Sequence, residues 1–236
     1  MTRSQETGNG AMNKGEEMPR AGGWGWLLLP TLLMFAGLNL VFGLFALRLG
    51  DPAAATSASL AVGPVTWSFL QLVLLWIAVS RLRASGVSVR ELIGFDRQRL
   101  LSDVGLGIVV AAACVAVILV SLWLVEPVFG GGELPFAPWA MIWWLLVTSI
   151  TAAVGEEVYF RGFLFDRLGR LSRPTLLLVT SLAFAVWHLS PVMLLHTFLV
   201  GLGLGWVYLA TRRLLPVMLG HWLTDVVGGF WLLGSW

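Results

Sequence analysis

The chain has 236 residues, of which 58% are hydrophobic and only 12% carry a charged side chain. Soluble domains carry about 25% charged residues, so this composition, with a mean hydropathy of +0.84, excludes an ordinary soluble domain and indicates an integral membrane protein. A formal charge of +2 provides no basic surface for nucleic acid, and we expect no nucleic-acid partner. The single cysteine, Cys114, excludes a disulfide within the chain.

Residues 1–22 are polar and glycine-rich, which predicts a disordered tail. The rest, 23–236, is predicted to be a single transmembrane domain of the all-α class. It would form about seven spans, because each apolar run is close to the ~20 residues that cross a bilayer. The predicted spans are 24–47, 62–79, 104–125, 139–165, 174–189, 192–210 and 216 onwards, with a loop at 126–138. The first run exceeds the 7–15-residue core of a signal peptide, so we expect it to be retained.

The arginine distribution predicts the orientation of these spans. With seven spans and a cytoplasmic N-terminus, every Lys and Arg except Arg48 falls on the inner side. Cytoplasmic loops carry an excess of basic residues. We therefore expect a cytoplasmic N-terminus, an external C-terminus and an arginine-rich inner loop at 81–99. The expected location is the plasma (inner) membrane of a prokaryote, with the lipid bilayer as a partner.

The fourth predicted span contains two adjacent carboxylates, Glu156 and Glu157, although residues 141–154 before them carry no charge. Ionisable residues inside a span are costly, and by default they indicate a functional site. Glu157 and Arg161 are four residues apart, so they share one face of a helix and can pair. Glu156 lies about 100° further round and points elsewhere. We therefore expect Glu156 to be free to act, whereas the alternative is that both glutamates reach toward the inner interface.

Two later spans supply histidines that could join these carboxylates. Phe184 and His188 are four apart in the fifth span, and His221 and Asp225 are four apart in the seventh. If spans four and five form a hairpin, Glu156 and His188 both lie about 20 Å from the turn and can face each other. His221, five residues after Pro216, is expected to lie shallower by about 10 Å. His196 has no charged residue at helical spacing, and we assign it a structural role.

Three mechanisms suit a carboxylate and two imidazoles inside a membrane. In the first, Glu156 and His188 deprotonate a water that attacks a peptide carbonyl, while His221, supported by Asp225, stabilises the oxyanion. In the second, Glu156, His188 and His221 bind zinc, although the chain has no HExxH sequence. In the third, these groups relay protons or ions in a transporter. A serine nucleophile is not indicated, because Gly-x-Ser-x-Gly is absent.

The order Glu156-Glu157-x-x-x-Arg161, Phe184-x-x-x-His188, His221-x-x-x-Asp225 resembles the three-motif pattern of the CAAX-protease and bacteriocin-processing (CPBP, or Abi) intramembrane endopeptidases. The resemblance covers about 139–236 and implies that the catalytic helices lie there. It implies that Glu156 and His188 activate water and that His221 and its partner form the oxyanion site, with Glu157, Arg161 and Phe184 supporting them. Because the last motif position is often Asn, and a carboxylate donates no hydrogen bond unless protonated, we expect Asp225 to orient His221.

The resemblance leaves the cofactor open, since members are described both as metalloproteases and as metal-free glutamate proteases. We expect no cofactor, because a water bridge tolerates the shallow position predicted for His221 better than a zinc bond does. Zinc held by Glu156, His188 and His221 is the alternative. The expected partner is a peptide or protein substrate at the membrane. The alternative function is a non-proteolytic membrane protein of the same fold, acting in bacteriocin immunity, as a scaffold or as an ion pathway.

Overall fold

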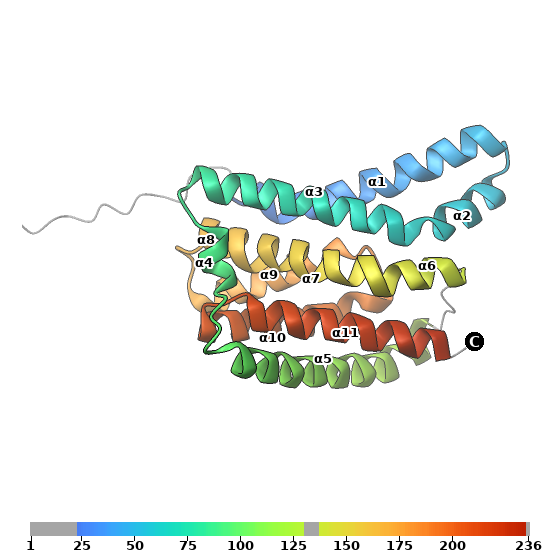
Figure 1. Cartoon of the computed structure of the whole chain (residues 1–236). Coiled ribbons are helices and arrows are strands. Elements are labelled where there is room, and N and C mark those ends of the chain that lie inside the picture. Colours follow the sequence, from blue (N-terminus) through green and yellow to red (C-terminus); the bar gives the residue numbers. More distant parts are fainter. Residues whose placement is uncertain (1–22, 130–136, 235–236) are drawn as a thin grey trace, which may run out of the picture.

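The structure is a computed structural model that describes residues 23–129 and 137–234, and it contains no strand within these ranges. The elements in chain order are α1 (Gly25–Leu49), α2 (Pro52–Ala61), α3 (Gly63–Ala84), α4 (Val89–Ile93), α5 (Leu100–Phe129), α6 (Pro138–Trp143), η1 (Trp144–Thr148), α7 (Ser149–Glu157), η2 (Val158–Phe163), α8 (Leu164–Arg167), α9 (Arg173–Trp187), α10 (Pro191–Thr211) and α11 (Leu215–Gly234). The long helices run alongside one another, with α1 and α3 on one side, α5 and α11 on the other, and α6–α9 between them (Figure 1). The predicted all-α class is confirmed.

Within the described residues, five helical stretches are long and apolar enough to cross a membrane: Gly25–Leu49, Gly63–Ala84, Leu100–Val125, Pro138–Arg167 and Pro191–Thr211. They correspond to five of the seven predicted spans and confirm a polytopic membrane protein. The predicted fifth span is α9, which has only 15 residues and is therefore about 22 Å long. The total of seven spans stays a prediction, as does the division into a tail and one domain, since 1–22 lie outside the described residues.

Some predicted loops contain helix. Helix α2 lies in the connection between the first two spans, where the Asp51 side chain accepts a hydrogen bond from Ala53 N and Pro52 occupies the first helical turn. These are start signals for a helix as well as turn signals. The predicted loop at 126–138 is also partly wrong, because α5 continues through Pro127 to Phe129. The rest of that loop, 130–136, lies outside the described residues.

The predicted fourth span is one helical run from Pro138 to Arg167 that contains two π-helical segments, η1 and η2. Segment η2 begins immediately after Glu157 and contains Arg161. π-helical turns are rare and are found disproportionately at functional sites. A π-helical turn contains more residues than an α-helical turn, so it shifts every later side chain to a different face of the helix. Segment η1 therefore affects the faces of Glu156 and Glu157, and η2 affects the face of Arg161.

Glycines allow the helices that carry these residues to pack closely. A Cβ added to Gly155 on α7 would lie 2.7 Å from the backbone oxygen of Gln71 on α3. On the other side of the molecule, a Cβ added to Gly220 on α11 would lie 2.5 Å from Val110 of α5. Such small residues let helix backbones approach in a membrane protein. The close contact at Gly155 brings Gln71 of α3 within hydrogen-bond distance of Glu156 on α7.

Candidate active site

Glu157 is fully buried and receives two hydrogen bonds on one oxygen. Its Oε1 lies 2.8 Å from Arg161 Nη1 and 2.7 Å from His221 Nδ1. A carboxylate accepts hydrogen bonds and donates none, so His221 carries a proton on Nδ1. Arg161 Nη2 also donates to the backbone oxygen of Gly201 on α10, at 3.1 Å. Glu157 and Arg161 therefore pair as expected, and together they tie α7, η2, α10 and α11 to one point.

The contact between His221 and Glu157 corrects the predicted depth of His221. We expected this histidine about 10 Å shallower than Glu156, but it reaches the neighbouring carboxylate directly. The predicted depth was counted in residues from the nearest turn. This count assumes that the two turns lie at the same depth in the membrane and that every residue rises equally along its helix axis. Because the two side chains are in direct contact, the turns that precede α9 and α11 are not level, and the wide turns of η2 add a smaller departure from equal advance.

Glu156 is also buried, and its hydrogen bonds come from other helices. Its Oε1 accepts from Gln71 Nε2 of α3 at 3.0 Å and from Trp187 Nε1 of α9 at 3.1 Å. Its other oxygen, Oε2, is buried and has no hydrogen-bond partner among the residues that the structure describes. A buried carboxylate oxygen without a protein partner is available to a water or a substrate group.

His188 caps the C-terminus of α9, and the chain reverses at Leu189, which has a positive φ of 51°. Its Nδ1 lies 2.8 Å from the backbone oxygen of Phe184. A carbonyl oxygen accepts only, so Nδ1 carries the proton in neutral His188 and Nε2 keeps a lone pair. Glu156 and His221 are near enough to interact electrostatically with His188. No direct hydrogen bond joins His188 to Glu156 in the described part of the chain.

Phe184 lies among the charged and imidazole side chains. Its ring centroid is 5.1 Å from that of His188 and 5.9 Å from that of His221. The guanidinium carbon of Arg161 lies 4.4 Å from the Phe184 centroid, over the ring face, which is a cation–π arrangement. The second predicted motif therefore supplies the surface against which both imidazoles and the arginine pack.

Asp225 lies beside the second nitrogen of His221. Its Oδ2 is 3.7 Å from His221 Nε2, which is within ion-pair range but beyond a hydrogen bond. His221 thus has a carboxylate on each side: Glu157 bonds Nδ1, and Asp225 is near Nε2. All seven side chains predicted from the sequence lie in or beside this cluster, through direct contacts or electrostatic proximity.

The sequence analysis missed three polar residues of the cluster: Gln71, Thr151 and Trp187. Gln71 is the one side-chain amide within the predicted second span, and a polar residue inside a span is a signal that could have identified it. Trp187 directly precedes His188, but nothing local shows that its indole faces a carboxylate. His196, to which the sequence analysis assigns a structural role, is buried on α10.

In the described ranges, no group of three or more His, Cys, Asp or Glu residues is placed to hold a metal ion. The Nδ1 atom of His221 is bonded to Glu157, and the Nδ1 atom of His188 is bonded to the Phe184 carbonyl oxygen. A zinc ion would need Glu156 and both remaining Nε2 atoms at about 2.0–2.2 Å from one point.

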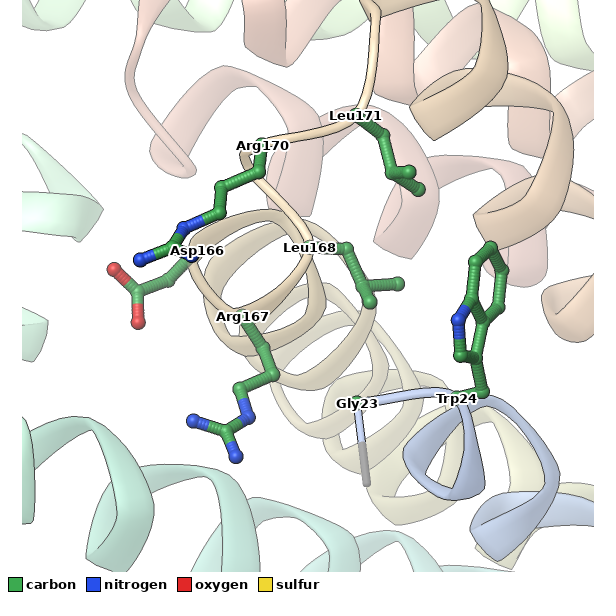
Figure 2. Close-up of a pocket in the computed structure, with 7 residues that line it drawn as sticks. All are labelled: Gly23, Trp24, Asp166, Arg167, Leu168, Arg170 and Leu171. Atoms are coloured by element: carbon green, nitrogen blue, oxygen red, sulfur yellow. The ribbon is translucent and has the colours of Figure 1, made fainter. Parts of the chain in front are cut away.

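Two cavities lie outside this cluster. One, of about 210 Å³, is formed at the start of α1 and the turn after α8, and Figure 2 shows its lining. It is lined by Gly23, Trp24, Asp166, Arg167, Leu168, Arg170 and Leu171. The other, of about 240 Å³, lies between α1 and α9 and is almost wholly apolar. Neither is lined by a side chain of the buried polar cluster.

The fold and the cluster define a class of protein: a polytopic helical membrane protein with buried glutamates, histidines and an arginine in its later helices. Residues 138–227 match the family model described as Rce1-like, type II CAAX prenyl endopeptidase. The match covers less than half of the chain, contains all seven predicted site residues and confirms the resemblance seen in the sequence. This segment is therefore similar to a family of membrane endopeptidases. No curated protein and no solved structure matched the chain.

Proposed function

We propose that this protein is an intramembrane endopeptidase in which Glu156 and His188 activate a water molecule and His221 stabilises the oxyanion. The observation that carries the proposal is the environment of Glu156: two neutral N–H groups hold Oε1, and Oε2 is buried without a partner in the described residues. Fixed in this way, a carboxylate can accept a proton from water without first reorganising its surroundings. Glu157 also keeps an Oε2 without a partner in that part of the chain, but it is paired with the Arg161 guanidinium.

In the proposed reaction, Glu156 Oε2 takes one proton from a water whose other contact is the lone pair of His188 Nε2. The resulting hydroxide oxygen forms a bond to the peptide carbonyl carbon, and the carbonyl oxygen takes up the negative charge. His221 holds Glu157 through Nδ1–H, and with a second proton it offers Nε2–H to this oxyanion. When the C–N bond breaks, the proton on Glu156 passes to the leaving amine.

The proposed substrate is a peptide or protein segment that reaches the site from the cytoplasmic side or laterally between helices. A prenylated CAAX sequence is suggested by the description of the matching family, and the residues of the site do not by themselves select a lipid. The proposed location is the plasma membrane of a prokaryote. The arginine distribution predicts which ends of the helices face the cytoplasm there.

The test is cleavage by purified protein of two internally quenched peptides, one ending in a prenylated CAAX sequence and one unmodified. Mass spectrometry of a digested peptide library would detect other substrates. We expect cleavage by the wild type and a loss of at least about 100-fold in kcat for Glu156→Gln, since a general base contributes about 10²–10⁴-fold. The control is Glu91→Gln in α4, which exchanges an exposed glutamate outside the cluster. If no peptide is cleaved in a Glu156-dependent manner, the non-proteolytic alternative is preferred.

We also propose that the reaction needs no metal, and metal analysis of protein purified without chelator tests this. The expected result is far less than one zinc per chain and full activity after treatment with a chelator. Stoichiometric zinc that is lost together with activity in His188→Ala would overturn the metal-free mechanism and make Glu156 a ligand.

A further inference from the structure

We infer that Gln71, oriented by Thr151, is a positioning residue that selects the reacting oxygen of Glu156; the inference rests on the proposed function. Gln71 Nε2 donates to Glu156 Oε1 at 3.0 Å, and Thr151 Oγ1 lies 2.6 Å from Gln71 Oε1. Gln71 lies on α3, outside the segment 138–227 that matches the family model. The first half of the chain therefore contributes to the site.

The direction of each hydrogen bond follows from the chemistry of the groups. An ionised Glu156 accepts only, so Gln71 must present its N–H and not its carbonyl oxygen to the carboxylate. The Gln71 carbonyl then faces Thr151, whose hydroxyl donates to it. Were the amide reversed, two acceptor oxygens would meet in a buried place, at a cost comparable to a lost hydrogen bond. The Glu156 carboxylate therefore sets the orientation of the Gln71 amide, and Thr151, whose hydroxyl also lies 3.1 Å from the Thr148 backbone oxygen, holds the amide in place from the other side.

The consequence is a difference between the two oxygens of Glu156. Oε1 is held from two sides, by Gln71 on α3 and by the Trp187 indole on α9. Oε2 has no partner in the part of the chain that the structure describes. Tilting the carboxylate plane would break two hydrogen bonds in a buried site, so one oxygen position, occupied by Oε2, remains directed at the water. Gln71 acts through Glu156 and makes no contact with the reacting atoms.

The test compares four variants with the wild type in the peptide assay. Gln71→Met keeps the length of the side chain and removes the donor, and Thr151→Val keeps its shape and removes the hydroxyl. We expect both to lower kcat by about 10–100-fold, because misplacement of a reacting group by about 1 Å can cost about 100-fold, with KM unchanged. Thr151→Ser restores the hydroxyl and should restore kcat. Thr180→Val is the matched control, because Thr180 is buried but its hydroxyl donates to backbone oxygens of its own helix.

A second measurement does not depend on activity. The infrared difference spectrum of wild type minus Glu156→Gln isolates the carboxylate band of Glu156, and we expect this band to shift in Gln71→Met and Thr151→Val but not in Thr180→Val. Wild-type kcat in the two variants, or a loss of kcat that Thr151→Ser does not restore, would overturn the inference. If Glu156→Gln itself cleaves as fast as the wild type, the proposed function fails instead. An unshifted band in folded Gln71→Met would show that the contact is absent.

Discussion

Glu156 and Glu157 are neighbours in the sequence, but their environments differ. Glu157 is held by a cation and an imidazole, both on the side of the site formed by α10 and α11. Glu156 is held by two neutral N–H donors from α3 and α9. Successive residues of a helix point about 100° apart, so adjacent carboxylates can serve different helices. Both carboxylates keep an Oε2 without a partner in the described residues, but only Glu157 is paired with a guanidinium, so we assign Glu157 to a structural ion pair and propose Glu156 as the reactive group.

The buried ion pair of Arg161 with Glu157 is expected to stabilise the folded protein. Arg161→Ala would leave the Glu157 carboxylate buried without its cation, and removal of one partner of a buried pair costs about 3–5 kcal/mol. We expect a clearly lower melting temperature in detergent, together with lost activity. The control is Arg99→Ala, which removes a solvent-exposed pair with Asp96 and should melt with the wild type. Equal melting of the Arg161 and Arg99 variants would contradict a stabilising role for the buried pair.

Asp225 provides a second test at the level of one residue. If it orients His221 through an acceptor oxygen, Asn can replace it, whereas Ala cannot. We expect Asp225→Asn to retain kcat within a few-fold and Asp225→Ala to lose about 10–100-fold. Steady-state cleavage kinetics would measure both. An Asn variant as inactive as the Ala variant would show that the charge of Asp225, rather than its position beside His221, is required.

At the scale of elements, the approach of α3 to α7 determines whether Gln71 can reach Glu156. A Cβ at Gly155 would lie 2.7 Å from the backbone oxygen of Gln71, which cannot move without moving α3. Gly155→Ala is therefore expected to cost about 1–3 kcal/mol, as overpacking does, and to lower kcat. Gly203→Ala on α10 is the control, because a Cβ there meets nothing within 4 Å. Equal stability and activity of the two variants would mean that this contact is not tight.

Helix α9, with 15 residues, is shorter than α3, α11 and the continuous run Pro138–Arg167, which carry other residues of the site, and its length has a consequence for the site. At about 22 Å, it ends before it has crossed the ~30 Å of hydrocarbon. His188 is therefore at a helix terminus, where the backbone already reverses at Leu189. This position allows the imidazole to bond the Phe184 carbonyl and fixes its protonated nitrogen.

The whole molecule has a predicted orientation in the membrane that labelling can test. The arginine-rich 81–99 segment and α2 lie at opposite ends of the helices (Figure 1). We expect Arg97→Cys to react with a membrane-impermeant thiol reagent only in inverted vesicles, and Ser57→Cys on α2 to react in intact cells. The native Cys114 is buried, so the wild type should remain unlabelled. Labelling of Arg97→Cys in intact cells would reverse the predicted topology.

By itself, the sequence determined the features that depend on local periodicity and hydropathy. These are the membrane class, most of the helices and the pairing of Glu157 with Arg161 at a spacing of four, because one helix carries both members. It also placed the family motifs on separate helices.

Only the tertiary structure decided which helices supply partners to each carboxylate. That Glu157 bonds His221 at 2.7 Å, and that Gln71 holds Glu156 from α3, depend on helix register, on the close contact at Gly155 and on the wide turns of η2. These quantities arise from packing between segments far apart in the chain. Helix register and packing cannot be obtained by counting residues from the nearest turn. For this reason the sequence-based prediction placed His221 too shallow.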